Sequence, residues 1–353
     1  MILAWSCALV ASAQEQVLSV AAAGDIMLGT NYPENRLPDD DGASFLAAVA
    51  PVLQAADVAI GNLEGVILDG GEPAKTCANP DACFLFRSPP RYAGLLRAAG
   101  FDVLSLANNH ARDFGEDGRT ATMAVLDDYD LRHSGRRGDI ASWQQNGLRL
   151  AFIAFSPTRL SYLLNDIPTA MQEVAALAAA HDIVIVSFHG GAEGPAAMDL
   201  PFEEEFYFGE TRGEVVRFAR AVIDVGADLV IGHGPHVPRA MELYRDRLVA
   251  YSLGNFATYY GVSVAGVAGV APLLVVDVAP DGRFLSGRIR SAVQIRPGGP
   301  VWDTQQRALE LIRDLTERSF GTVLFEFDAD GGFTAAATLP QQLGSFEYFS
   351  PQP

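Results

Sequence analysis

Polar side chains of the kinds that bind metal ions recur in this sequence at the ends of apolar runs. Four of the six histidines are among them, together with carboxylates and amides. Neutral imidazole and carboxylate suit zinc, manganese or iron, whereas calcium prefers oxygen ligands alone. The pattern therefore predicts a site for divalent metal, and its members are Asp25, Asn62, Glu64, Asn108, Asn109, His110, His189, Glu193, His233 and His236.

Each member of this set also has a simpler interpretation when it is taken alone. A Gly-Asp pair such as Gly24-Asp25 is common in turns after strands, and Asn108-Asn109-His110 could cap a helix. The other two histidines fit the pattern less well: His181 stands at a predicted helix end, and His133 lies among arginines. Because the pattern repeats at five separate strand ends, a shared functional site is the favoured interpretation.

Apolar runs of strand length carry these residues and alternate with helical patterns, which predicts a layered α/β fold. The carboxyl ends of parallel strands face one crevice, so residues far apart in sequence are expected to converge there. From Met241 onward successive strands predict an antiparallel sheet, and a final helix is expected near 304–318. The predicted strands are 17–28, 57–65, 101–109, 148–156, 182–191 and 227–234, and the predicted helices are 44–56, 90–99, 116–128, 169–180 and 211–225.

Composition limits the class of partner. The chain has 353 residues, of which 49% are hydrophobic and 19% charged, as in globular proteins rather than disordered ones. Its formal net charge is −18. A nucleic-acid partner is therefore not expected, because binding to phosphates needs a basic surface, and attraction to anionic membranes is disfavoured for the same reason.

The N-terminus and the cysteines bear on localisation. Residues 1–13 are apolar and end in Ala11-Ser12-Ala13, which predicts a cleaved signal peptide and export to the periplasm or the medium. Cys77 and Cys83 then remain in a C-x5-C loop. In an exported protein this spacing favours a short disulfide, and two thiols without a nearby histidine make a poor zinc site.

Six motifs in order, within residues 18–260, resemble the capsule-synthesis CapA family, which is associated with bacterial poly-gamma-glutamate production. That family is similar in turn to the calcineurin-like metallophosphoesterases. The resemblance implies a four-layer α/β/β/α sandwich with a metal centre, as one domain over residues 14–300 followed by a C-terminal helix and tail at 301–353. The motifs are GDIMLG (24–29), GNLEG (61–65), LANNHARDFGEDG (106–118), FHGGAEG (188–194), GHGPHVPRAMELY (232–244) and YSLGNF (251–256).

The resemblance also implies roles for single residues. The implied metal ligands are Asp25, Asn62 or Glu64 at the bridging position, Asn109, His189, His233 and His236, with His110 as the catalytic imidazole. Four departures leave one ion, two ions or none as alternatives. The bridging Asp of the superfamily is replaced by the Asn62-x-Glu64 arrangement. Met27 replaces the first histidine, Ala111 follows His110 in place of an acid, and the last histidine pair is spaced one residue wider.

Two functions are compatible with these residues. The first is a metal-dependent hydrolase of a phosphoester or amide, with zinc, manganese or iron activating water, His110 as acid and Glu193 orienting His189 or contacting substrate. Its partners would be an anionic polymer such as poly-gamma-glutamate, and capsule-assembly proteins. The alternative is a non-catalytic binding protein for such a polymer. Arg132, Arg136 and Arg137 would then contact carboxylates, unless they form only a solvated turn.

Overall fold

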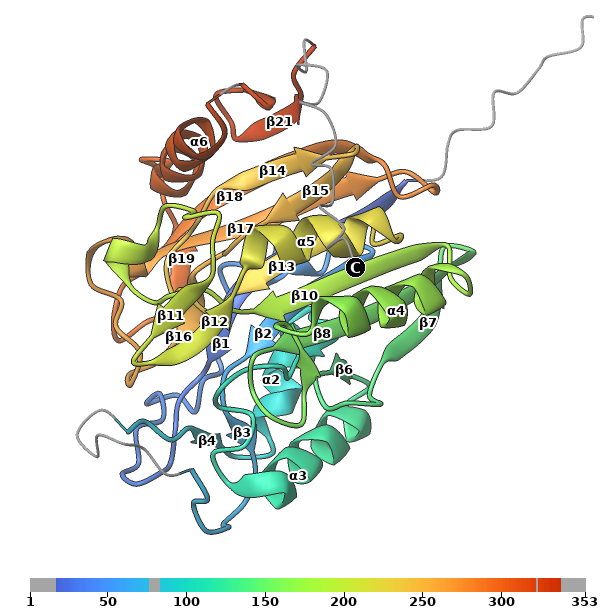
Figure 1. The fold of residues 1–353 in the computed structure, drawn as a ribbon. Helices are drawn as coiled ribbons and strands as arrows, with labels where there is room; N and C mark the ends of the chain where they lie inside the picture. Colours follow the sequence, from blue (N-terminus) through green and yellow to red (C-terminus); the bar gives the residue numbers. More distant parts are fainter. Residues whose placement is uncertain (1–16, 76–82, 322, 338–353) are drawn as a thin grey trace, which may run out of the picture.

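Two β-sheets packed face to face form the centre of the molecule (Figure 1). The computed structural model describes residues 17–75, 83–321 and 323–337. The predicted signal peptide (1–13) and Cys77 lie outside the described residues, whereas Cys83 is described and is disulfide-bonded. Within the described residues, no helix combines the length and the apolar character needed to cross a bilayer.

The first sheet is built around β1 (Leu18–Met27), which corresponds to the first predicted strand. β1 pairs in parallel with β2 and β16 and antiparallel with β17, so the sheet is mixed. The order of its main path is β20-β21-β18-β17-β1-β2-β5-β6. Its other strands are β2 (Val58–Leu63), β5 (Val103–Ser105), β6 (Arg132–Ser134), β16 (Asn255–Thr258), β17 (Val270–Val278), β18 (Phe284–Gln294), β19 (Pro300–Trp302), β20 (Phe325–Phe327) and β21 (Gly332–Ala335).

The second sheet has the order β14-β15-β13-β10-β8-β7, with β9 paired to β8. Its central strands are parallel, and the antiparallel pairs lie at its two edges. The strands predicted after Met241 are thus divided between both sheets. The strands are β7 (Ala141–Gln145), β8 (Leu148–Ser156), β9 (Tyr162–Leu163), β10 (Ile183–His189), β13 (Leu229–His233), β14 (Met241–Tyr244) and β15 (Arg247–Ala250).

The side chains of β1 alternate between two hydrophobic cores, and the first sheet thereby joins the second sheet to the helical layer. Val20 and Ala22 point into the core between the sheets, whereas Ala21 and Ala23 point into a second core under the helices, because successive side chains of a strand face opposite sides. A strand buried on both faces reads as one continuous apolar run, as this one does. Helices cover both outer faces, which confirms the predicted four-layer α/β/β/α sandwich (Figure 1).

The helices on the outer faces match the predicted ones with one large exception. Of the segment 44–56, only Ala50–Leu53 is α-helical, and turns precede it. Pro51 lacks an N–H and its ring opposes a helix that continues from upstream, which accounts for the short helix. The helices are α1 (Ala50–Leu53), α2 (Tyr92–Ala99) and α3 (Gly115–Asp128) on the first sheet, α4 (Ile167–Ala178) and α5 (Val215–Asp224) on the second, and α6 (Arg307–Phe320).

The C-terminal segment is joined to the sandwich rather than appended to it. Ala308, Leu309 and Ile312 of α6 are buried in the core between the sheets. β20 and β21, in a stretch predicted as a weakly patterned tail, extend the first sheet through pairing with β18. The short pairs β3 (Val66–Ile67) with β4 (Arg87–Ser88), and β11 (Glu205–Tyr207) with β12 (Glu210–Gly213), lie outside the two large sheets.

Candidate metal centre

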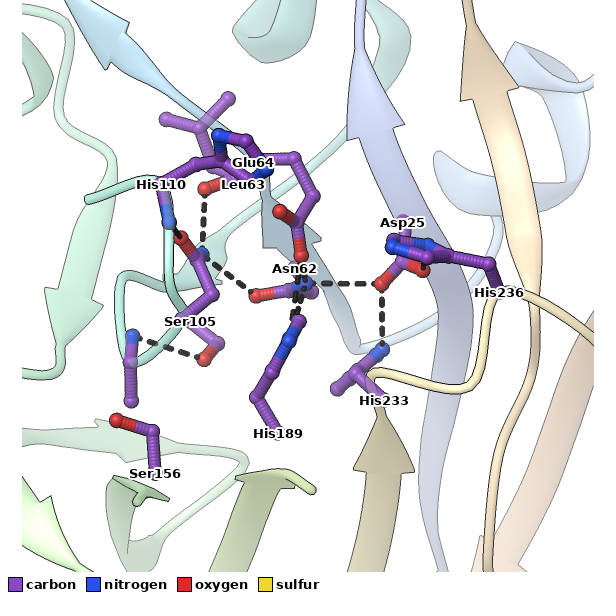
Figure 2. A network of polar contacts seen from close by, with 12 residues as sticks. Asp25, Asn62, Leu63, Glu64, Ser105, His110, Ser156, His189, His233 and His236 are labelled. Atoms are coloured by element: carbon purple, nitrogen blue, oxygen red, sulfur yellow. Dashed lines mark hydrogen bonds and ion pairs between the residues drawn. The ribbon is translucent and has the colours of Figure 1, made fainter. Parts of the chain in front are cut away.

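Strand register places the predicted ligands at the edges of the two sheets. Asp25 of β1 pairs with Asn62 of β2 and with Asn255 of β16. In the other sheet, His189 of β10 pairs with His233 of β13. Both groups stand at the carboxyl ends of parallel strands, and the two edges meet at one cluster of polar contacts (Figure 2).

The centre of this cluster is buried and dense in polar atoms. The Asn62 amide nitrogen donates to Asp25 Oδ1 at 2.8 Å and to Glu64 Oε1 at 2.6 Å. His189 Nδ1 lies 3.1 Å from the same Glu64 oxygen. One potential ligand atom from each of Asp25, Glu64 and His189 falls within 4.8 Å of the others, so the three residues can converge on one metal ion.

The donor set fits a divalent cation. Glu64 Oε2, Asn109 Oδ1 and His233 Nδ1 are buried without a hydrogen-bond partner among the described residues, and unpaired buried polar atoms are costly. Burial alone would raise the pKa of Asp25, but the nearby imidazoles of His233 and His236 outweigh it and hold that pKa below its ordinary value. Burial lowers the pKa of His189, which favours the neutral imidazole that a metal requires.

The amide of Asn62 is held in one orientation by Asn108. Asn108 Oδ1 accepts a hydrogen bond from the backbone N–H of His110, and Asn108 Nδ2 donates to the Leu63 carbonyl at 2.8 Å. Asn108 Nδ2 also donates to Asn62 Oδ1 at 3.0 Å. Asn62 therefore presents its NH2 group to the carboxylates, and it could offer an oxygen to a metal only if its amide turned and this bond was lost.

We expect Asn62→Asp to raise metal affinity and to destabilise the metal-free protein. The change removes two N–H donors and adds a third buried carboxylate beside Asp25 and Glu64. Without metal, the free energy of unfolding should fall by about 3 kcal/mol, as for a buried charge without a partner. Excess zinc or manganese should then raise the melting temperature more than it does in the wild type, because a cation neutralises the added charge.

Asn146→Asp is the matched control, since Asn146 donates to Asp57 at 2.7 Å on the exposed surface. It makes the same change of charge beside a carboxylate but should alter neither quantity appreciably. Thermal unfolding with EDTA and with added metal gives both readouts. Equal stability of Asn62→Asp and wild type in EDTA would contradict the expected role of the amide.

His236 completes the side of the cluster next to Asp25. Its Nδ1 lies 2.9 Å from Asp25 Oδ2 and 3.1 Å from Asn255 Oδ1, and Asn255 Nδ2 donates to the His236 carbonyl. His236 has a positive φ of 58°, an uncommon conformation that neighbouring contacts must hold. The H-x-x-H spacing thus brings both histidines to Asp25, with His233 Nδ1 at 3.6 Å.

A buried arginine that was not predicted from the sequence, Arg212, borders the cluster on the side of His189 and Glu193. The Arg212 guanidinium, from β12, donates to Glu193 Oε1 at 2.8 Å and lies 3.4 Å from His189 Nε2. Arginine only donates hydrogen bonds, so His189 Nε2 accepts and its Nδ1 carries the proton toward Glu64 in this arrangement. Glu193 Oε2 is 4.0 Å from His236 Nε2, which places the predicted Glu193 beside the cluster.

His110 stands beside Glu64 (Figure 2), and the buried carboxylate of Asp113 holds its imidazole. His110 Nδ1 lies 2.8 Å from Asp113 Oδ2, and Phe86 packs against the imidazole with ring centroids 4.4 Å apart. Lys75, the single lysine of the chain, places Nζ 3.3 Å from Asp113 Oδ1. The acid absent at position 111 is thus supplied three residues after His110, at a position outside the predicted set of site residues.

The remaining predicted residues are placed less centrally or elsewhere. Asn109 is half-buried, and the cap proposed for Asn108-Asn109-His110 is absent because α3 begins only at Gly115. His133 binds Asp139 and Asp127 at 2.9 and 3.2 Å. Burial alone would lower the His133 pKa, but these carboxylates outweigh it and raise that pKa. His133 therefore links α3 to the loop after β6 and takes no part in the cluster.

The fold and the cluster together define a class of protein: a four-layer α/β/β/α sandwich with a candidate metal centre at the carboxyl ends of its strands. The family model of the bacterial capsule synthesis protein PGA_cap matches residues 19–260. This match covers well over half of the chain, and the chain belongs to that family. The motifs that suggested a capsule-synthesis family are therefore confirmed.

Two curated relatives agree with this assignment. The chain is 29% identical over 268 residues to capsule biosynthesis protein CapA of Bacillus anthracis, covering 69% of this chain and 60% of the relative. It is 28% identical over 259 residues to PGA biosynthesis protein CapA of Bacillus subtilis, covering 69% and 63%. It thus spans less than two thirds of the length of either relative. A calcineurin-like phosphoesterase structure from Bacillus subtilis is similar at a TM-score of 0.45 and 14% identity, covering 79% of this chain and 91% of that one.

Proposed function

We propose that this protein is an exported, metal-dependent hydrolase that acts on an acidic polymer of capsule or poly-gamma-glutamate metabolism. The observation that carries the proposal is the buried group of Asp25, Glu64 and His189 beside a histidine–carboxylate pair. Membership of a capsule-synthesis family supports the substrate class, as do the names of the relatives. Export rests on the sequence of residues 1–13.

The roles of the residues follow from their contacts. Asp25, Glu64 and His189 would hold the ion. His233 and His236 lie next to Asp25 and are further candidate ligands. A bound divalent ion supplies a Lewis acid and lowers the pKa of a coordinated water. Because Asp113 fixes Nδ1 of His110, the other ring nitrogen is left to donate a proton to the leaving group. Arg212 holds Glu193 at the rim of the centre.

Metal analysis of the purified protein, joined to a substrate panel, tests the proposal. The protein is stripped with EDTA, reloaded separately with zinc, manganese and iron, and assayed for bound metal. We expect at least about one ion per chain, and cleavage of either a gamma-glutamyl polymer or a phosphodiester that EDTA abolishes and metal restores. Absence of both bound metal and turnover in every reloaded sample would refute the hydrolase.

A specific observation favours a second candidate function, that of a non-catalytic binding protein for the same polymer. N–H donors of Asn62, His189 and His236 already meet the carboxylates of Asp25 and Glu64 without any metal. This candidate requires that polymer binding survives both EDTA and the His110→Ala substitution. Loss of polymer binding on chelation would exclude it.

A further inference from the structure

A pocket apart from the metal centre is lined by several arginines, although the chain has a net charge of −18. Its volume is about 360 Å3, and its walls include Arg119, Arg136, Arg137 and Arg159. We propose that this arginine pocket binds the carboxylate groups of an acidic polymer. The inference adds a binding site to the proposed function and does not depend on hydrolysis.

The guanidinium groups of the pocket are only partly neutralised by the protein. Glu116 forms ion pairs with Arg112 at 2.5 Å and with Arg119 at 2.6 Å, so its charge is already shared. Asp166 accepts a hydrogen bond from the Thr169 N–H at the start of α4. Among the described residues, Arg136, Arg137 and Arg159 have no carboxylate within ion-pair distance, although Glu173 stands in the same wall.

The loop between these arginines is held in an unusual conformation. Leu160 has a positive φ of 69° and an exposed side chain. Its carbonyl accepts hydrogen bonds from Arg119 Nη1 at 3.3 Å and from the backbone N–H of Arg137 at 3.2 Å. A strained, solvent-exposed residue that two arginines hold in place is typical of a binding loop.

The chemistry of the pocket favours an oxyanion. A planar guanidinium donates two parallel hydrogen bonds to a carboxylate, so several of them suit a chain of repeated acidic groups. Burial lowers the pKa of Arg119 and outweighs the pairing with Glu116, which raises it, while the neighbouring charges of Arg112 and Arg136 add to the lowering. A bound anion would relieve this repulsion among like charges.

The position of the pocket connects it to the metal centre. Arg136 and Arg137 follow β6, and Arg159 follows β8, so the pocket opens at the same carboxyl ends of strands as the centre. The segment from His110 through Arg112 into the first turn of α3 runs from one site to the other. An extended acidic chain held by the arginines would therefore lie along the edge that carries the metal centre.

Binding of a fluorescent poly-gamma-glutamate oligomer, measured by anisotropy at fixed salt, tests the pocket. We expect Arg136→Gln and Arg159→Gln each to weaken binding about tenfold, the size of one charge-assisted hydrogen bond, and the double variant to weaken it further. Arg132→Gln is the matched control: Arg132 lies in the same segment but is exposed and stacks on Trp143 at 5.2 Å, outside the pocket. The control should bind like the wild type.

Other measurements separate this site from the proposed hydrolase. Binding by the EDTA-treated protein should persist, and unchanged melting temperatures of the variants would show that the fold is intact. Equal weakening in Arg132→Gln would overturn the proposal, because general charge would then explain binding. Unchanged affinity in the double variant would overturn it too. Displacement of the oligomer by an equal concentration of inorganic phosphate would assign the pocket to phosphate instead.

Discussion

The Asp25→Asn variant is expected to lose metal affinity by at least about 100-fold and hydrolysis by on the order of 10³-fold. Asp25 is the residue on which the two sheets converge, with Asn62, His233 and His236 all in contact with it or close to it. Asparagine fills the same space but removes the negative charge. Metal content by mass spectrometry and metal affinity by calorimetry measure the first effect, and turnover measures the second.

Asp303→Asn is a matched control for this variant. Asp303 is also buried and accepts hydrogen bonds from backbone and arginine at the start of α6. It follows β19, which β18 and β17 separate from β1 in the first sheet. Its replacement should cost stability and leave the metal content unchanged. If Asp25→Asn keeps the metal content and affinity of the wild type, the assignment of this carboxylate to the centre is wrong.

The same variant should change the pH dependence of stability in EDTA. Burial alone would lower the pKa of His236, but Asp25 raises it to about 9, above its ordinary value of 6.5. The pair therefore contributes its full stability below about 6.5 and loses it as the pH rises through about 9. That contribution is up to about 3 kcal/mol in the wild type, and it should be largely absent from Asp25→Asn. Urea unfolding across this range measures the difference.

Replacement of His110 by glutamine should reduce turnover by about 10²- to 10⁴-fold while metal content stays at the wild-type level. Glutamine can accept or donate a hydrogen bond but cannot transfer a proton at neutral pH. Asp113→Asn should cause a smaller loss, because it leaves the imidazole in place and weakens only the contact that orients it. The loss of turnover in His110→Gln should be smaller for substrates with a more acidic leaving group, because such a group departs with less need of a proton from a general acid.

His181→Gln controls for the loss of a histidine as such. His181 binds the Leu177 carbonyl and Ser142 at the end of α4, away from the cluster. It should leave turnover and metal content unchanged. Wild-type turnover of His110→Gln with leaving groups of every acidity would rule out the proposed acid, and a parallel loss of metal would reassign His110 as a ligand.

Local pattern predicted the strands that carry the cluster. β1, β10 and β13 lie close to their predicted limits because a strand buried on both faces must be apolar throughout. The segment 44–56 was predicted less well, since its apolar spacing suits a helix whereas Pro51 restricts the helical part to Ala50–Leu53. The strands at 325–335 were missed because their apolar residues pack on a sheet formed by distant segments.

The sequence by itself determined which side chains are available for metal chemistry and placed them at strand ends, because residue type and periodicity are local properties. Only the tertiary structure decided which of them meet: Asn62 and His189 are 127 residues apart, and His236 and Asp25 are 211 apart. It also fixed the Asn62 amide through Asn108. It brought Arg212 next to His189 and Glu193, and Asp113 next to His110. It separated Arg132 from Arg136 and Arg137, although the three are close in the chain. Such contacts depend on how two sheets pack and on which loops their edges support, and no local pattern encodes that.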